Sequence, residues 1–313
     1  MASPPPDIHA LADERARARD ARDFAAADAL RDRISEAGWL VVDRPDGYEL
    51  KPKPPYDVLD RLTDLTDNSA AADERRATVS LVVDGWPDDV RTCIDALLAN
   101  TSDDVVVQAL DLGNVDGAGD ALHDFAGPRL QAWHLAGPAG WSAARTALLR
   151  ADTARTHVWC DLSTVFTGDA LTPLLDVIDT SDDVVGAGWR GVNVDLADEW
   201  RSLADAPAGA VDAVLGYLFA MRRSAALAAG GPHPKARFYR NADIEFSFAL
   251  REAAGPGARL VVAPGELPVR QDRHRGYHDS DPEVRDKESA RTYNRFLQRF
   301  RGRADLLAPR DEN

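Results

Sequence analysis

The sequence has only two cysteines, Cys93 and Cys160, and both lie in apolar stretches. Their number and spacing exclude a disulfide framework and a cysteine-based zinc site, so a reducing compartment is expected. No apolar run is long enough to span a bilayer, and the Pro-rich start lacks the basic and apolar segments of a signal peptide. We therefore expect a cytoplasmic protein without a transmembrane segment.

Positive charge is also scarce. The 313 residues contain 37 Lys and Arg against 52 Asp and Glu, which gives a net charge of −15. Such a balance argues against a general nucleic-acid binder, because phosphate contacts need a positive surface. Residues 269–303 are the exception, with ten basic and six acidic side chains. The apolar content of 44% predicts a globular protein with a real core.

Two common nucleotide-binding motifs are missing. No G-x-x-x-x-G-K-[ST] segment occurs, which excludes a P-loop. Gly113, Gly117 and Gly119 follow a predicted strand, but their spacing differs from the G-x-G-x-x-G pattern that brings a backbone close to a pyrophosphate. We interpret them as a glycine-rich loop only.

The N-terminal 55 residues have the pattern of a small separate module. Residues 8–37 contain neither Gly nor Pro, and their apolar residues have helical spacing, which predicts two helices with the first ending near Arg22. Residues 39–50 predict a β-hairpin with a Pro-Asp-Gly turn at residues 45–47. Residues 51–55 are a Pro-rich linker.

A set of residues in this module follows a specific order. The set is Arg19, Arg22, Asp23, Phe24, Ala27, Asp28, Leu30, Arg31, Ile34, Gly38, Trp39, Val41, Asp43 and Gly47. Through these residues the module resembles the C-terminal tail of bacterial cysteinyl-tRNA synthetases. The resemblance implies contact with RNA or a protein partner through residues 8–52, whereas the slightly negative charge of the segment favours a scaffold or dimerisation element. None of the synthetase's catalytic motifs is present, so aminoacylation is not implied.

Residues 77–161 alternate between short strands and helices. Strands are predicted at residues 77–84, 104–111, 131–135 and up to 161, with a helix over residues 142–155 before the last strand. This order indicates an α/β fold with a mostly parallel, doubly wound sheet. Asp84, Asp111 and Asp161 each end a strand, at the sheet edge where open α/β sheets bind ligands. Each could instead be an ordinary helix N-cap.

Several sequence blocks between residues 77 and 300 occur in a recognisable order. They are residues 78–98, Asp111, residues 140–148, 158–163, 217–231 and 241–251, and finally His274. In this order the blocks resemble the GT-A-fold, family-2-like glycosyltransferases over residues 77–300. The segment around Asp161 stands where the family has its D-x-D motif, here reduced to Asp161-Leu-Ser163.

The resemblance implies a GT-A-like domain over residues 56–268, followed at 269–313 by a basic loop and a helix packed on it. It implies transfer of a sugar from a nucleotide-sugar donor to an unknown acceptor, with inversion. Asp243 would be the catalytic base and Glu245 the second choice, because both lie in the first turn of a predicted helix. The alternative for both is capping of first-turn amides.

The resemblance also implies how the donor is held. Asp84, Asp111, Asp161 and Arg145 would bind the nucleotide, with Arg273 and Arg275 at its phosphates. Mg²⁺ or Mn²⁺ would be bound by Asp161 and His274. Ser163 is a weak ligand in place of the second D-x-D carboxylate, so cations such as Arg145 could neutralise the diphosphate instead.

The end of the chain leaves two readings open. Residues 288–301 predict a helix with Tyr293, Phe296, Leu297 and Phe300 on one face, which either docks on the body or contacts an anionic membrane surface.

The missing second D-x-D carboxylate also keeps a second function open, that of an inactive GT-A-fold binding or scaffold protein. A nucleotidyltransferase is disfavoured, because the loop after Asp84 lacks that class's Gly-rich, basic pattern.

Overall fold

The computed structural model describes residues 3–44, 46–125 and 127–310. Contacts divide the chain into two compact units, Met1–Asp60 and Arg61–Asn313, and each is described by itself. The domain borders expected at residues 55 and 268 stay predictions.

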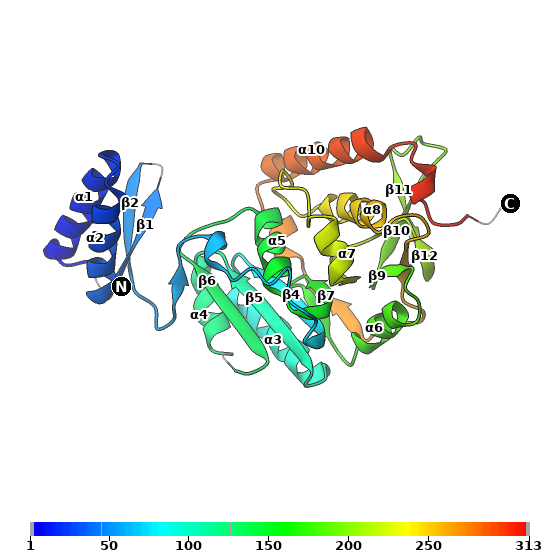
Figure 1. The fold of residues 1–313 in the computed structure, drawn as a ribbon, viewed down its shortest axis with the longest axis horizontal. Helices are drawn as coiled ribbons and strands as arrows, with labels where there is room; N and C mark the ends of the chain where they lie inside the picture. Colours follow the sequence, from blue (N-terminus) through cyan, green and yellow to red (C-terminus); the bar gives the residue numbers. More distant parts are fainter. Residues whose placement is uncertain (1–2, 45, 126, 311–313) are drawn as a thin grey trace. The chain divides into compact units, whose positions relative to one another are not determined.

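The first unit, blue in Figure 1, contains the expected pair of helices and the β-hairpin. Asp23 caps the second helix by accepting a hydrogen bond from the Ala26 N–H at 3.1 Å, which places the break between the helices where it was predicted. Of the predicted Pro-Asp-Gly turn, Pro45 lies outside the described residues. The elements are α1 (Pro6–Asp20), α2 (Phe24–Glu36), β1 (Trp39–Arg44), β2 (Gly47–Pro52) and β3 (Val58–Leu59).

A small core joins these helices to the hairpin. Ile8, Ala12 and Ile34 from the helices pack with Trp39 and Val41 from β1. The buried Arg15 side chain donates two hydrogen bonds to the Asp43 carboxylate, at 2.8 and 3.2 Å. This bidentate pair compensates the buried charge of Arg15 with a carboxylate at the edge of the core, because the Asp43 side chain is 47% exposed.

The second unit is built on a mixed sheet. Within this unit its strands lie in the order β12-β15-β9-β14-β7-β4-β5-β6. The strands β7, β4, β5 and β6 are parallel, while β14 runs antiparallel to both of its neighbours. The predicted mostly parallel α/β sheet is confirmed. Its strands are β4 (Arg75–Val83), β5 (Val105–Asp111), β6 (Leu130–Leu135), β7 (Ala154–Cys160), β9 (Val184–Gly188), β12 (Gly209–Val211), β14 (Leu218–Arg222) and β15 (Arg259–Val262).

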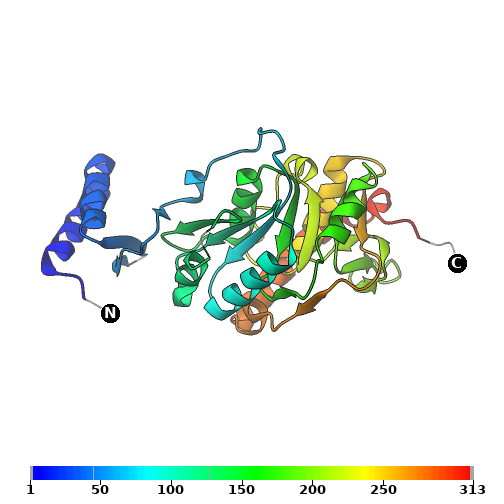
Figure 2. The same cartoon turned by 90° about the horizontal axis from the view of Figure 1, so that it is seen from below.

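Helices cover both faces of this sheet (Figures 1 and 2). Val158 and Cys160 pack into the core under α3, α4 and α6, whereas Trp159 between them packs with α8 and α10 on the other face, as the two-residue period of a strand requires. The helices are α3 (Pro87–Asn100), α4 (Ala118–His123), α5 (Trp141–Ala151), α6 (Thr172–Asp179), α7 (Arg223–Ala228), α8 (Ala242–Ala254), α9 (Arg275–His278) and α10 (Pro282–Phe300), with 3-10 turns η1 (Leu62–Asp64), η2 (Val115–Gly117) and η3 (Ala304–Leu306).

One helix is shorter than expected. The helix predicted over residues 142–155 begins at Trp141 and ends at Ala151. Ala154 already pairs with Arg75 in β4, so the strand β7 takes the residues that a longer helix would use.

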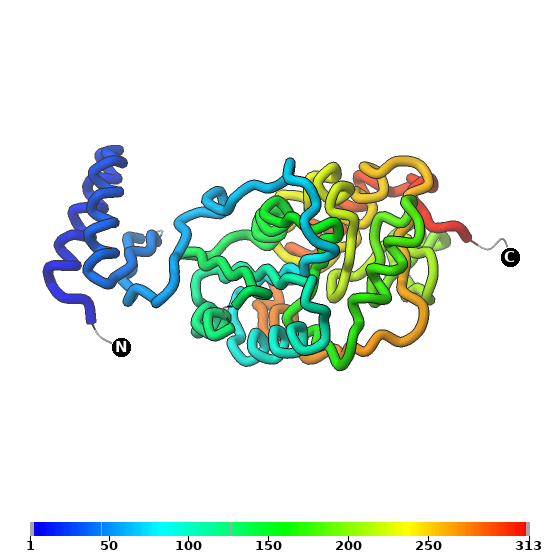
Figure 3. Tube along the Cα trace, turned by 60° about the horizontal axis from the view of Figure 1, so that its bottom comes forward, coloured from blue at the N-terminus to red at the C-terminus, as the bar shows by residue number. Residues whose placement is uncertain are grey.

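Two smaller sheets complete the unit. The strand β10 (Gly191–Val194) lies between β11 (Leu203–Ala206) and β13 (Ala213–Val214). The strand β8 (Thr164–Phe166) pairs antiparallel with β16 (Val269–Gln271). After β16 the chain, orange in Figure 3, returns to the middle of the unit and enters α9.

The apolar face of α10 is used inside the unit. Phe296 and Phe300 are fully buried, and both contact Phe248 of α8. The Tyr293 hydroxyl donates a hydrogen bond to the Trp200 carbonyl oxygen at 2.8 Å. Among the described residues, no helix has the length and apolar character needed to cross a bilayer.

Candidate active site

A cavity of about 330 Å³ opens at the carboxyl ends of β4, β5 and β7. One wall is apolar and includes Val82, Leu112 and Pro138. The charged part of the lining comes from the segments that follow the strands and from α9. These charged residues are Asp84, Asp89, Arg145, Asp161, Arg237, His274 and Arg275.

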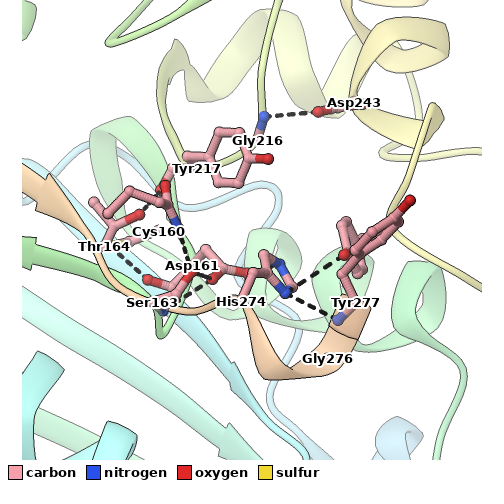
Figure 4. Close-up of polar contacts among 12 residues, drawn as sticks. Cys160, Asp161, Ser163, Thr164, Gly216, Tyr217, Asp243, His274, Gly276 and Tyr277 are labelled. Atoms are coloured by element: carbon pink, nitrogen blue, oxygen red, sulfur yellow. Dashed lines mark hydrogen bonds and ion pairs between the residues drawn. The ribbon is translucent and has the colours of Figure 1, made fainter. Parts of the chain in front are cut away.

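Asp161 stands directly after β7 and is held from three directions (Figure 4). Its Oδ1 accepts hydrogen bonds from the Ser163 N–H at 2.9 Å and from the Ser163 hydroxyl. Its Oδ2 lies 2.9 Å from Nε2 of His274. Burial opposes ionisation, but the bonds from His274 and Ser163 outweigh it and lower the pKa of Asp161.

His274 is fixed as firmly as its partner. Its Nδ1 accepts the Tyr277 N–H at 3.1 Å, so the hydrogen-bond network assigns a proton to Nε2, which donates to Asp161. Tyr239 stacks on the imidazole with 4.4 Å between ring centroids. Burial alone would lower the pKa of His274, but the hydrogen bond and charge of Asp161 raise it.

Arg145 supplies a fixed positive charge behind the cavity. Its guanidinium donates to the Ser80 carbonyl oxygen at 2.8 Å and to the Cys160 carbonyl oxygen at 3.0 Å. The rings of Trp141 and Trp159 lie 5.8 and 5.6 Å away. Burial lowers the pKa of Arg145 to about 10, so it still carries its charge at neutral pH.

Asp84 and Asp89 face the same cavity. Asp84 is open to the cavity but closely surrounded by protein, and this burial, together with the charge of Asp161, raises its pKa to about 6. Asp89 lies 3.3 Å from Nε of Arg275, which joins the start of α3 to the start of α9. The cavity therefore presents acidic and basic groups side by side.

A second cavity of about 170 Å³ adjoins the first, because Trp141, Arg145, Asp161, Tyr239 and His274 line both. Asp243, in the first turn of α8, lies on its wall. The Asp243 carboxylate accepts the Gly216 N–H at 2.8 Å and the Ile244 N–H at 2.9 Å.

Burial raises the pKa of Asp243 to about 6, against the opposing effect of the backbone hydrogen bonds. The carboxylate thus has a proton affinity well above that of an exposed aspartate.

Three of the predicted site residues are not among the described residues that line the two cavities. Asp111 is buried, where its carboxylate accepts the Asn114 N–H at 2.9 Å and lies 3.1 Å from Nδ1 of His134. Glu245 is buried in a bidentate pair with Arg295, at 2.5 and 2.6 Å. Arg273 pairs with Asp279 at the surface, at 2.6 Å.

The position of Glu245 follows from helix geometry. Two residues along an α-helix correspond to a rotation of about 200°. Because Asp243 faces the second cavity, Glu245 must point away from it. The catalytic role first considered for Glu245 stays untested, but its side chain has no access to either cavity.

Sequence reasoning missed Asp89, Trp141, Arg237, Tyr239 and Arg240, all of which line a cavity. For three of them a signal was present. The segment from Lys235 to Arg240 alternates basic and aromatic side chains inside an otherwise acidic body. Such interleaving is typical of anion-binding loops.

The residues present do not form a preformed metal site. Among the described residues, no group of three or more His, Cys, Asp or Glu side chains is placed to hold a metal ion. Asp161 and His274 bind each other, and the Ser163 hydroxyl that bonds to Asp161 also accepts a hydrogen bond from Gln271. The metal-binding role of Asp161 and His274 stays a prediction.

Comparison with known families decides the assignment of this unit. The model for glycosyl transferase family 2 matches residues 85–246, which is about half of the chain. The chain belongs to glycosyl transferase family 2. The matched residues of this family 2 domain include Asp89, Arg145, Asp161 and Asp243, so both cavities fall within or beside it.

The N-terminal unit matches a different family. The model for the cysteinyl-tRNA ligase anticodon binding domain matches residues 3–49. Cysteine–tRNA ligases of Opitutus terrae and Cereibacter sphaeroides are 54% and 55% identical to this chain over 48 and 47 residues. These matches cover 15% and 14% of the chain and only 10% and 9% of the ligases.

Solved structures agree with the family 2 assignment at the level of fold. GalNAc-T7, solved with UDP, GalNAc and Mn²⁺, gives a TM-score of 0.55 at 13% identity, covering 72% of this chain and 48% of that protein. The mannosyltransferase PcManGT from Pyrobaculum calidifontis, solved with GDP-Man and Mn²⁺, gives 0.53 at 20% identity, covering 79% and 68%. The chain therefore spans about half of the length of the first and about two thirds of the second.

Proposed function

We propose that this chain is a glycosyltransferase, which moves a sugar from a nucleotide-diphosphate donor to a hydroxyl group of an acceptor with inversion at the sugar carbon. The observation that carries the proposal is Asp243, a half-buried carboxylate with a raised pKa on the wall of a cavity that adjoins the strand-end cavity. Membership of glycosyl transferase family 2 supports the reaction class.

The larger cavity is the proposed donor site. It lies at the carboxyl ends of the strands, where α/β sheets bind nucleotides. Its apolar wall suits a nucleobase, and Asp84 suits ribose hydroxyls. UDP and GDP-Man are bound in the similar structures named above, which supports a nucleoside diphosphate as the common part of the donor. Asp111 and Arg273 are not needed in this arrangement.

Asp243 would act as the general base. The acceptor hydroxyl gives its proton to the Asp243 carboxylate as the acceptor oxygen forms a bond to the sugar carbon. The bond from that carbon to the diphosphate oxygen breaks, and the nucleoside diphosphate leaves with the bonding electrons. A base with a pKa of about 6 is mostly ionised at pH 7 and still accepts a proton readily.

The leaving diphosphate needs positive charge nearby. Arg237 and Arg275 line the larger cavity and can reach a bound anion, while Arg145 adds its fixed charge from behind. Because the described residues do not form a preformed metal site, no step in this mechanism is assigned to a metal ion.

The test combines binding with turnover. Thermal shift with UDP, GDP and dTDP should reveal which nucleotide stabilises the protein, since a ligand that binds only the folded state raises its stability. Asp243→Asn should keep that shift and lower sugar transfer or donor hydrolysis by at least about 100-fold, the usual contribution of a general base. Asp95→Asn, at an exposed position on α3, is the matched control. Wild-type turnover in Asp243→Asn would refute the assignment.

A second candidate is a binding or scaffold protein that has lost catalysis. The specific observation in its favour is that Asp161 is already saturated by Ser163 and His274. In that case residues 8–52 would dock RNA or a protein, in keeping with their similarity to the ligase anticodon binding domain. A nucleotide shift without any donor turnover, in wild type and variant alike, would favour this candidate.

A further inference from the structure

Three exposed arginines, two of which line the cavities, differ from most other arginines of the second unit. Most of those pair with a carboxylate, as expected in a chain with a net charge of −15. Arg190, Arg237 and Arg240 have no carboxylate within ion-pair distance in the part of the chain that the structure describes. Their charges are therefore available to a ligand.

Arg237 and Arg240 line different cavities. Arg237 lines the larger cavity, beside the proposed donor site. Arg240 lines the smaller cavity with Asp243, and also a third cavity of about 300 Å³. The smaller and third cavities share Tyr217, Tyr239, Arg240 and His274, so they adjoin each other.

Aromatic rings support the guanidinium groups without neutralising them. Arg240 lies 5.0 Å from the centre of the Tyr277 ring and donates a hydrogen bond to the Tyr277 hydroxyl. Arg190 lies 4.2 Å from the centre of the Trp189 ring. Cation–π contact orients an arginine while its N–H groups stay free for a planar anion.

Arg190 and Arg240 belong to the same part of the unit. The Arg190 carbonyl oxygen accepts a hydrogen bond from the Leu215 N–H at 2.9 Å, and Leu215 lines the smaller cavity. Arg240 lines that cavity itself, together with Asp243. The two positive charges are thus carried by segments that border the cavity of Asp243.

We propose that the acceptor is anionic: a hydroxyl compound whose phosphate or carboxylate group is bound by Arg240 and Arg190 while its hydroxyl faces Asp243. This inference rests on the proposed function, because it names the substrate class of that site. The competing explanation is that Arg240 binds the diphosphate of the donor, and the experiment distinguishes this from binding of an anionic acceptor.

The experiment first fills the donor cavity with saturating UDP or GDP. Calorimetric titrations at constant ionic strength then compare glycerol 3-phosphate with glycerol, and glucose 6-phosphate and glucuronate with glucose. We expect the charged member of a pair to bind at least about tenfold more tightly, as charge-assisted hydrogen bonds to arginine imply. The ratio between glucose 6-phosphate and glucuronate shows whether phosphate or carboxylate is preferred.

Variants connect the preference to the two arginines. Arg240→Ala and Arg190→Ala should each remove most of the preference for the charged compound and leave nucleotide affinity unchanged. Arg201→Ala, an exposed arginine that pairs with Glu199 instead, should change neither quantity.

Equal affinity for charged and neutral compounds with nucleotide bound would overturn the inference. So would a loss of nucleotide affinity in Arg240→Ala, because it would assign this arginine to the donor. An anion preference that survives both variants would also overturn it. A failure of every nucleotide to bind, in contrast, would overturn the proposed function itself.

Discussion

Replacing Asp243 by asparagine should stabilise the protein at neutral pH while it removes activity. The pKa of Asp243 is raised from 3.8 to about 6, so the folded state holds this proton more tightly than the unfolded state. The contribution of Asp243 to the free energy of unfolding of the wild type is therefore highest below about pH 4. It falls as the pH rises to about 6 and is constant above that.

The structure gives the size of the effect. A shift of about 2 pKa units corresponds to an upper limit of ~3 kcal/mol lost from the free energy of unfolding above pH 6. Asparagine avoids this loss, but its amide has one oxygen for the two donors, Gly216 N–H and Ile244 N–H, and leaving one unpaired costs about 1 kcal/mol. We expect the variant to equal wild type near pH 4.5 and to exceed it by about 2 kcal/mol at pH 7.5.

Urea unfolding at these two pH values measures the difference directly, with the slope of the transition checked for equality between proteins. Asp95→Asn should stay within about 0.5 kcal/mol of wild type at both pH values, because its side chain is exposed. A stability difference for Asp243→Asn that does not change with pH would refute the raised pKa, and with it the argument that burial prepares Asp243 as a base.

Two further substitutions test assignments made above. Glu245→Gln breaks the buried bidentate pair with Arg295 and should lower the free energy of unfolding, measured by urea titration, by about 3 kcal/mol. The folded fraction of this variant should keep its donor turnover. Lost turnover at unchanged stability would restore the catalytic role of Glu245. Gly119→Ala places a Cβ 2.4 Å from Asp111 Oδ2 and should lower stability by about 1–3 kcal/mol, measured by thermal melting, whereas Gly140→Ala meets nothing within 4 Å. Equal melting temperatures for the two alanine variants would contradict the close packing of Asp111.

Local patterns predicted the parts of the fold that depend on period. A strand ending at Asp161 was predicted, and the structure places its consecutive side chains Val158, Trp159 and Cys160 in two different core clusters, one on each face. Asp84 and Asp161, each expected at a strand end, both line the cavity at the carboxyl ends of the strands, and their role in binding a ligand stays a prediction. These predictions succeed because a strand end is a property of the local chain and of the sheet edge alone.

Predictions failed to locate side chains where a distant partner decides the outcome. Asp111 also ends a strand, but His134 and the Asn114 N–H bind its carboxylate inside the protein. No feature of residues 104–111 indicates that a histidine of the neighbouring strand β6 lies opposite Asp111. Glu245 is different, since its helical phase relative to Asp243 was readable from the sequence.

The last prediction concerns Ser163, which stands where the resemblance predicts the second carboxylate of a D-x-D motif. Ser163→Asp would bring a second carboxylate beside Asp161, whose own carboxylate is bound by Ser163 and His274 in the wild type. In chelator the variant should melt below wild type, because two carboxylates then compete for the same few donors.

With Mn²⁺ the order should change, because two carboxylates and an imidazole form a donor set that the described wild-type residues lack. Saturation at 100 times the dissociation constant corresponds to a gain of about 2.7 kcal/mol for the variant, and we expect a smaller response from wild type. An equal response from both proteins would mean that Asp161 and His274 give up their mutual bond to hold the ion unaided. The metal site predicted from the sequence would then stand, and the serine would be no obstacle to it.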